Sequence, residues 1–194
     1  LAVALEFHRL VARDLAGRFV LGPRSGELGA AAGEDRLLAA AAPALSALRD
    51  ATGESAQLYR RQGDLRICVA VAERLSGLRD SVPVGAALTM QAGSAAQILL
   101  AWEDSEKIHR GLTNARFTAA QLSADRRRGW AQSVGEREAG VASVSAPVRA
   151  PNGKVIAAVS ISGPIERLGR QPGRIHAAAV VATAARLTEH LARE

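Results

Sequence analysis

Alternation of hydrophobic and polar positions marks the predicted strands of this chain. Residues 55–60 and 65–72 alternate on either side of Gln62-Gly63-Asp64, which predicts a hairpin. Residues 82–90 predict a further strand. Two more alternating segments flank Asn152-Gly153 within GVASVSAPVRAPNGKVIAAVSISGP. The chain therefore contains at least two hairpins.

The Asn152-Gly153 pair predicts a two-residue type I′ turn, which would set the register of its hairpin by symmetry. One face of that hairpin is then apolar, and it pairs Ala150 with Val155, Val148 with Ala157, Ala146 with Val159 and Val144 with Ile161. The other face pairs Arg149 with Ile156, Pro147 with Ala158, Ser145 with Ser160 and Ser143 with Ser162. Four serines at one end form either wetted surface or the polar floor of a ligand pocket.

Apolar residues at helical spacing predict the helices. They cover residues 1–11, 34–52, 94–102, 105–111, 118–128 and about 172–194. Thr118 has Gln121 three positions on, which predicts a capping box. Residues 12–22 read as two very short strands, and residues 24–33 as a short linking helix that ends at Gly33. The order predicts an α+β domain with helices on one side of its sheet, preceded by a small appendage.

Composition and charge narrow the class of protein. Hydrophobic residues make up 48% of the chain, as in soluble globular proteins, and the longest apolar run, residues 37–48, is short and contains Pro43. We therefore expect no membrane span, and no signal peptide is visible. The net charge of +6 permits binding to phosphate, although an arginine-rich proteome would explain it equally well. Cys68, the only cysteine, lies in a strand pattern and indicates a reducing cytoplasm.

Motifs of enzymes are not found. The chain has no nucleophile elbow, no phosphate-binding loop and no dinucleotide fingerprint. Its histidines have no metal-ligand spacing (His8, His109, His176 and His190). We expect no catalytic residue, metal or cofactor. One alternative is an enzyme that uses a hairpin serine, but no histidine has the sequence context of its base.

A DNA-binding element is predicted at the start of the chain. A helix followed at once by a tiny hairpin that bears Arg13 and Arg18 has the layout of the second half of a winged helix-turn-helix. The recognition helix, ending near Arg9, would lie in the major groove, and the arginines would contact phosphate or the minor groove. The alternative is a surface hairpin whose arginines only face solvent. The charge of the segment, taken alone, favours this alternative over a DNA-binding wing.

A ligand site is predicted where Ala92-Gly93-Ser94 joins a strand to a helix. Free backbone N–H groups at a helix N-terminus bind carboxylates well. The alternative is that Ser94 only caps the helix. Opposite the hairpin serines, this terminus would bind a small acid or amino acid, and Leu88 and Met90 would supply apolar walls.

Several motifs in order resemble the IclR family of bacterial transcription regulators. They are RFVLGPRSGELG, RRRGWAQS, GVASVSAPV and AAVSISGP. The segments SAQLYRRQGDLRICVAVAERLSGLRDSVPVG and TMQAGSAAQILLAWE resemble its actinobacterial regulators of amino-acid metabolism, notably leucine biosynthesis. The resemblance implies the end of a winged helix-turn-helix domain at 1–22, a linker helix at 23–33 and a GAF-like effector-binding domain at 34–194. It also implies that the first helices and most base contacts precede residue 1.

The resemblance also places the effector contacts. It puts them at Ser94 and Ala95, at Ser133 where the family has an acid, at Ser143 where it often has cysteine, and at Ser160 and Ser162. With Met90 these are the predicted effector-binding residues, and Arg9, Arg13 and Arg18 are the predicted DNA-binding ones. The implied protein is a cytoplasmic homodimer or homotetramer. It binds a double-stranded DNA operator and an amino acid or small organic acid. The alternative is a stand-alone GAF-like sensor that acts through a protein partner.

Overall fold

The computed structural model describes residues 1–25, 27 and 36–193. The chain divides into two compact units, Leu1–Ala39 and Ala40–Glu194. The linking helix predicted at 23–33 falls largely outside the described residues and stays a prediction.

The first unit includes the short helix α1 (Ala2–Phe7) and a hairpin of β1 (Val11–Arg13) and β2 (Phe19–Leu21). The helix is shorter than its apolar spacing predicted. It ends at Phe7 because Arg9 adopts a left-handed conformation, with φ of 59°, and Val11 pairs with Leu21 in the hairpin. The two short strands predicted in residues 12–22 are confirmed.

The second unit is built on a six-stranded antiparallel sheet with the order β5-β4-β3-β8-β7-β6. Its strands are β3 (Ser55–Gln62), β4 (Leu65–Ala72), β5 (Ala87–Thr89), β6 (Ala131–Val134), β7 (Val141–Arg149) and β8 (Val155–Pro164). The strand predicted at 82–90 forms only over its last part, after Pro83 and the left-handed Gly85. Strand β6 was not predicted, because four residues are too few for a clear alternation.

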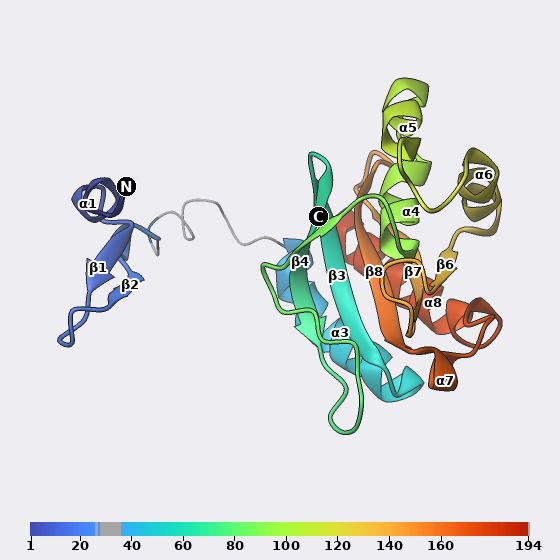
Figure 1. Ribbon diagram of the computed structural model, residues 1–194, viewed down its shortest axis with the longest axis horizontal. Helices are drawn as coiled ribbons and strands as arrows, with labels where there is room; N and C mark the ends of the chain where they lie inside the picture. The colour runs from blue at the N-terminus through green and yellow to red at the C-terminus, as the bar shows by residue number, and fades with distance from the viewer. Residues whose placement is uncertain (26, 28–35, 194) are drawn as a thin grey trace. The chain divides into compact units, whose positions relative to one another are not determined.

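Helices cover both faces of the sheet, so the expectation of helices on one side was wrong. They are α3 (Arg36–Thr52), α4 (Ser94–Ala101), α5 (Ser105–Leu112), α6 (Ala119–Arg128), α7 (Ile165–Leu168) and α8 (Gly173–Ala192). Figure 1 shows α3 and α8 behind the sheet and α4 on its other face, with α5 and α6 beyond it. Every residue of α4 is buried, and its apolar residues form one cluster with Tyr59 and Cys68 of the sheet. The capping box of Thr118 and Gln121 at the start of α6 is confirmed.

The hairpin of β7 and β8 has the predicted register but not the predicted turn. Pairs from Ser143 with Ser162 to Val148 with Ala157 are confirmed, whereas Arg149 pairs with Val155 across a bulge. At the turn, the Gly153 N–H donates to the Ala150 carbonyl and only Gly153 has a positive φ. This is a type I turn with a glycine bulge. A type I′ turn would need an N–H from Pro151, which proline lacks.

Candidate functional site

Residues from α4, five strands and two loops meet around a small cavity at the start of α4. Six of the predicted effector residues line it: Ser94, Ala95, Ser133, Ser143, Ser160 and Ser162. The cavity has a volume of about 20 Å³, enough for about one water molecule. Ligand pockets usually measure roughly 300–1,000 Å³. In this structure the six residues therefore pack together and leave no room for a ligand larger than water.

A chain of hydrogen-bonded hydroxyl groups connects five serines, while Ser162 bonds the Gln57 amide instead. Ser133 bonds Ser143 at 2.9 Å between oxygens, and Ser143 bonds Ser94 at 2.7 Å. Ser94 also bonds Ser145 at 2.7 Å, and the Ser145 hydroxyl donates to Ser160 at 2.8 Å. Ser94, Ser133, Ser145 and Ser160 are buried. These hydroxyls are consequently not the wetted surface that the pattern alone allowed.

The start of α4 is organised by glycine and not by a capping serine. Gly93 is the N-cap, with φ of 97°, and the Ser94 side chain makes no capping bond. The Gly93 N–H donates to a carboxylate oxygen of Glu136 at 2.8 Å, and the Gln97 amide donates to the other at 2.9 Å. Burial raises the pKa of Glu136, against the lowering effect of the Gly93 N–H. A carboxylate from the chain itself therefore already binds at this helix terminus.

Arg66 of β4 is a site residue that the sequence analysis missed. It lines the cavity and is only 3% exposed. One terminal nitrogen donates to the Thr89 carbonyl, and the guanidinium carbon lies 5.6 Å from the centre of the Tyr59 ring. Its Nε has no hydrogen-bond partner among the described residues. Strand alternation puts Arg66 on the same face as the buried Cys68, and that signal alone could have identified it.

An ion pair on the cavity wall joins two loops. The Arg137 guanidinium donates to both carboxylate oxygens of Asp80, at 2.7 and 2.6 Å. Asp80 lies between β4 and β5, and Arg137 between β6 and β7. Both line the cavity. No local pattern pairs them, because 57 positions separate them in the chain.

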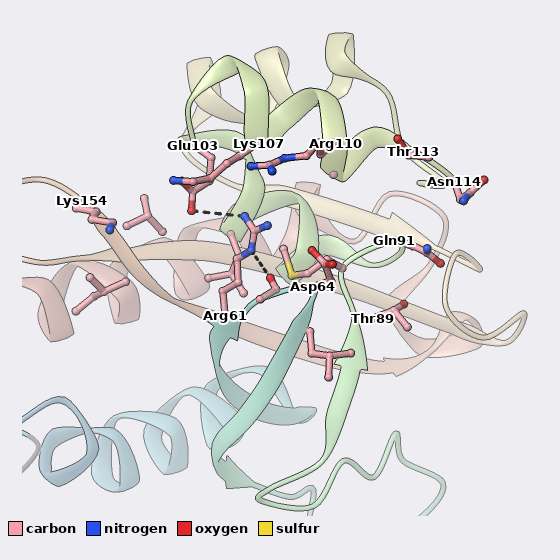
Figure 2. A pocket seen from close by; sticks show the side chains of 17 residues that line it. Arg61, Asp64, Thr89, Gln91, Glu103, Lys107, Arg110, Thr113, Asn114 and Lys154 are labelled. Carbon is pink, nitrogen blue, oxygen red and sulfur yellow. Dashed lines mark hydrogen bonds and ion pairs between the residues drawn. The ribbon is translucent and has the colours of Figure 1, made fainter.

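Met90 is not brought together with the serines. It lines a second, more open cavity of about 980 Å³, between α5, the β3–β4 turn and the start of β8 (Figure 2). Two cations there share an acidic neighbour, since Arg61 lies 3.5 Å and Lys107 3.1 Å from Glu103, whereas no ion pair of Lys154 is found among the described residues. The serine cavity is the stronger candidate site because its cation without an ion pair among the described residues, Arg66, is buried, whereas Lys154 is exposed.

The three predicted DNA-binding arginines lie in the first unit and are exposed. Each forms an ion pair: Arg9 with Glu27 at 2.7 Å, Arg13 with Glu6 at 2.9 Å and Arg18 with Asp14 at 2.8 Å. Arg13 also lies over the Phe19 ring, 4.2 Å from its centre. Exposed ion pairs contribute little to stability, so these cations remain able to exchange acidic partners for phosphate.

Among residues 1–25, 27 and 36–193, no helix is long and apolar enough to cross a membrane. The family model of the C-terminal region of the bacterial transcriptional regulator IclR matches residues 30–189. No curated protein matches the chain in sequence.

Solved structures agree with the family match. An IclR-family regulator from a Silicibacter species is 25% identical with a TM-score of 0.83, and the match covers 100% of this chain and 82% of that one. A regulator from Alicyclobacillus acidocaldarius is 25% identical with a TM-score of 0.80, over 97% and 82% of the two chains. The Thermotoga maritima IclR, at 20% identity and a TM-score of 0.77, shares the fold over 99% and 83%.

These findings confirm the predicted α+β, GAF-like effector-binding fold. Members of the family are transcriptional regulators and not enzymes, which confirms that expectation as well. They bind DNA and small-molecule effectors and are typically oligomeric. The chain belongs to the IclR family of bacterial transcriptional regulators, and its second unit is the core of the effector-binding domain.

Proposed function

We propose that the protein controls amino-acid biosynthesis genes, such as those of leucine biosynthesis, in response to an amino acid or small organic acid. The effector binds between the start of α4 and the serines of β6, β7 and β8. The observation that carries this proposal is the buried serine chain, which lines a cavity together with a charged arginine. Residues 1–22 belong to the DNA-binding domain, 23–33 to a linker helix and 34–194 to the effector domain. The active protein is a cytoplasmic homodimer or homotetramer on its operator.

The hydroxyl chain supports a ligand with polar groups of its own. Each serine has one proton to donate and two lone pairs to accept. Ser145 donates to Ser160, and Ser160 donates to the Ile161 carbonyl at 3.4 Å, so these protons are used internally. Spare lone pairs on the same oxygens remain for an ammonium or hydroxyl group. An effector that carries such a group can replace hydrogen bonds between the serines with hydrogen bonds between the serines and the ligand.

Regulation requires that the effector bind one arrangement of the protein better than another. The cavity of about 20 Å³ is too small for an amino acid, so ligand binding must displace part of its wall. The loops joined by Asp80 and Arg137 are the part that can separate without opening the sheet. The free energy of that opening couples the effector to the DNA-binding region.

Calorimetric titration with leucine, methionine and their keto acids tests the proposal. We expect saturable binding of at least one compound, and at least about tenfold weaker binding in Ser94→Ala, because that substitution removes the central hydroxyl of the chain. Ser105→Ala, at the exposed start of α5, is the matched control and should bind as the wild type does. Saturable binding of none of the four compounds would contradict an amino-acid effector.

A further inference from the structure

Arg66 is a buried cation without an anionic partner. Among the described residues it forms no ion pair, and its Nε has no hydrogen-bond partner at all. Burial lowers the pKa of its guanidinium to about 10, which leaves it charged at neutral pH. A buried charge is costly unless it is paired and hydrogen-bonded. The folded chain keeps this cation where an incoming anion would relieve that cost.

The nearby carboxylates are already engaged elsewhere. Both oxygens of Asp80 accept from Arg137, and Glu136 accepts from the Gly93 N–H and the Gln97 amide. Neither lies within ion-pair distance of Arg66. The Nε–H donor of Arg66 is therefore not part of an internal salt bridge with a slightly displaced carboxylate. It is a donor without an acceptor among the described residues.

The guanidinium lies against the start of α4. A Cβ atom on Gly93 would lie 3.1 Å from a terminal nitrogen of Arg66, so the absence of a side chain at Gly93 makes room for it. The first N–H groups of the helix, those of Ser94 and Ala95, have no carbonyl of their own helix to bond. Arg66 and the helix start thus present N–H donors to one side of the cavity, and the serines lie on the other.

We propose that Arg66 binds the carboxylate of a small monocarboxylate effector through its Nε and a terminal nitrogen. This inference rests on the proposed function, because it places the effector in the same cavity. Guanidinium binds carboxylate in a planar, two-bond geometry, and such bonds are stronger than those between neutral groups. The serine hydroxyls then bind the remaining polar group of the ligand.

The surroundings favour one negative charge on the ligand and not two. Arg66 is the only cavity-lining cation, among the described residues, that lacks an acidic partner, since Arg137 is paired with Asp80. The serines are neutral, and a second carboxylate would approach Asp80 or Glu136. Repulsion between a second ligand carboxylate and either of these acidic side chains would weaken binding. Dicarboxylates should consequently bind more weakly than monocarboxylates of the same length.

The test measures ligand affinity and thermal unfolding of the whole protein in three variants. Arg66→Met removes the charge at similar length, Arg66→Lys keeps the charge without the planar fork, and Arg61→Met is the control. Arg61 lies directly opposite Arg66 in the sheet but already has Glu103 as a partner. The probes are acetate, leucine, the keto acid of leucine, and leucinamide, which lacks the carboxylate; sodium chloride matches the ionic strength.

We expect at least one monocarboxylate to raise the unfolding temperature of the wild type and of Arg61→Met, while leucinamide and chloride do not. Arg66→Met should lose this shift and bind at least about thirtyfold more weakly, and Arg66→Lys should be intermediate. Without ligand, Arg66→Met should unfold at the same temperature as the wild type or higher, because an unpaired buried charge has gone.

Four results would overturn the inference. Retained affinity in Arg66→Met, or equal binding of leucine and leucinamide, would exclude a carboxylate contact at Arg66 and leave the effector cavity itself in place. A ligand-free Arg66→Met that unfolds well below the wild type, with Arg66→Lys unchanged in affinity, would assign Arg66 a structural role. No effect of any monocarboxylate on the wild type would exclude this ligand class, while operator binding would still test the regulatory function separately.

Discussion

At the scale of single residues, Asp125 shows how burial alters a carboxyl group outside the cavity. It is fully buried on α6, one of its oxygens accepts from Arg128 at 2.5 Å, and the other has no partner among the described residues. Loss of hydration raises its pKa to about 6, and the charge of Arg128 only partly opposes this. The sequence predicted helix α6 and its cap but not this buried acid, because a single Asp among surface-like residues carries no periodic signal.

Stability should therefore depend on pH through Asp125. The folded state holds the proton with a pKa of about 6 and the unfolded chain with one near 3.8. The folded state thus binds more protons in this window, and stability falls as pH rises from about 4 to 7. Relative to Asp125→Asn, the wild type should lose about 2–3 kcal/mol across that range. Urea unfolding of both proteins at several pH values measures the difference, and parallel pH curves would contradict the assignment.

At the scale of elements, most strongly periodic segments formed where they were predicted, and short ones were missed. Strands β3 and β4 and helix α3 follow their patterns closely, whereas β6 and α7 are four residues each and too short to show a period. The β7–β8 hairpin combines a register that was predicted with a turn that was not. The predicted turn was wrong, but the predicted register was still correct from Val148 back to Ser143. The reason is that the bulge at Arg149 restores the pairing that a two-residue turn would have produced.

Two substitutions in the turn distinguish the observed geometry from the predicted one. Gly153→Ala should destabilise the protein by about 1–2 kcal/mol, because a side chain disfavours the φ of 81° at this position. Asn152→Ala should cost less, about 0.5 kcal/mol, since it removes only the hydrogen bond from the Lys154 N–H. Urea unfolding compares the two variants. In a type I′ turn both residues need positive φ, so equal costs would favour that turn.

The ion pair between Asp80 and Arg137 should hold the β4–β5 loop against the β6–β7 loop. Asp80→Asn removes the charge and should increase amide hydrogen exchange in residues 77–86 roughly tenfold, because a largely buried ion pair, in which one Arg137 nitrogen contacts both carboxylate oxygens, is lost. Asp50→Asn, which alters an exposed pair with Arg49 on α3, is the control. Unchanged exchange in the loop would mean that other contacts keep the cavity closed.

At the scale of the whole molecule, the chain combines a unit that carries the arginine-bearing hairpin with an effector-binding unit. A regulator needs both, since the effector alters the affinity for DNA only if the two sites are coupled. The exposed arginines of the hairpin support the DNA-binding role, although each now pairs with an acid of its own unit.

Operator binding provides the test of that role. In the intact regulator, Arg13→Ala with Arg18→Ala should weaken operator binding and reduce the slope of log affinity against log salt by about 2, because two phosphate contacts are lost. Arg110→Ala, an exposed arginine of α5, is the matched control. Fluorescence anisotropy at several salt concentrations gives both quantities. Unchanged binding would favour a GAF-like sensor that acts through a protein partner.

The sequence by itself determined the features that depend on near neighbours. Alternation determined which residues of β7 and β8 share a face, and so placed Ser143 beside Ser162 and Ser145 beside Ser160. Only the tertiary structure decided what those serines face. Arg66, Glu136 and the Asp80–Arg137 pair come from separate parts of the chain, and their contacts depend on how the sheet and α4 pack. Local periodicity determines on which face of the sheet a side chain lies. The free-energy cost of burying a charged side chain depends on its hydrogen-bond and ion-pair partners, which come from distant parts of the sequence.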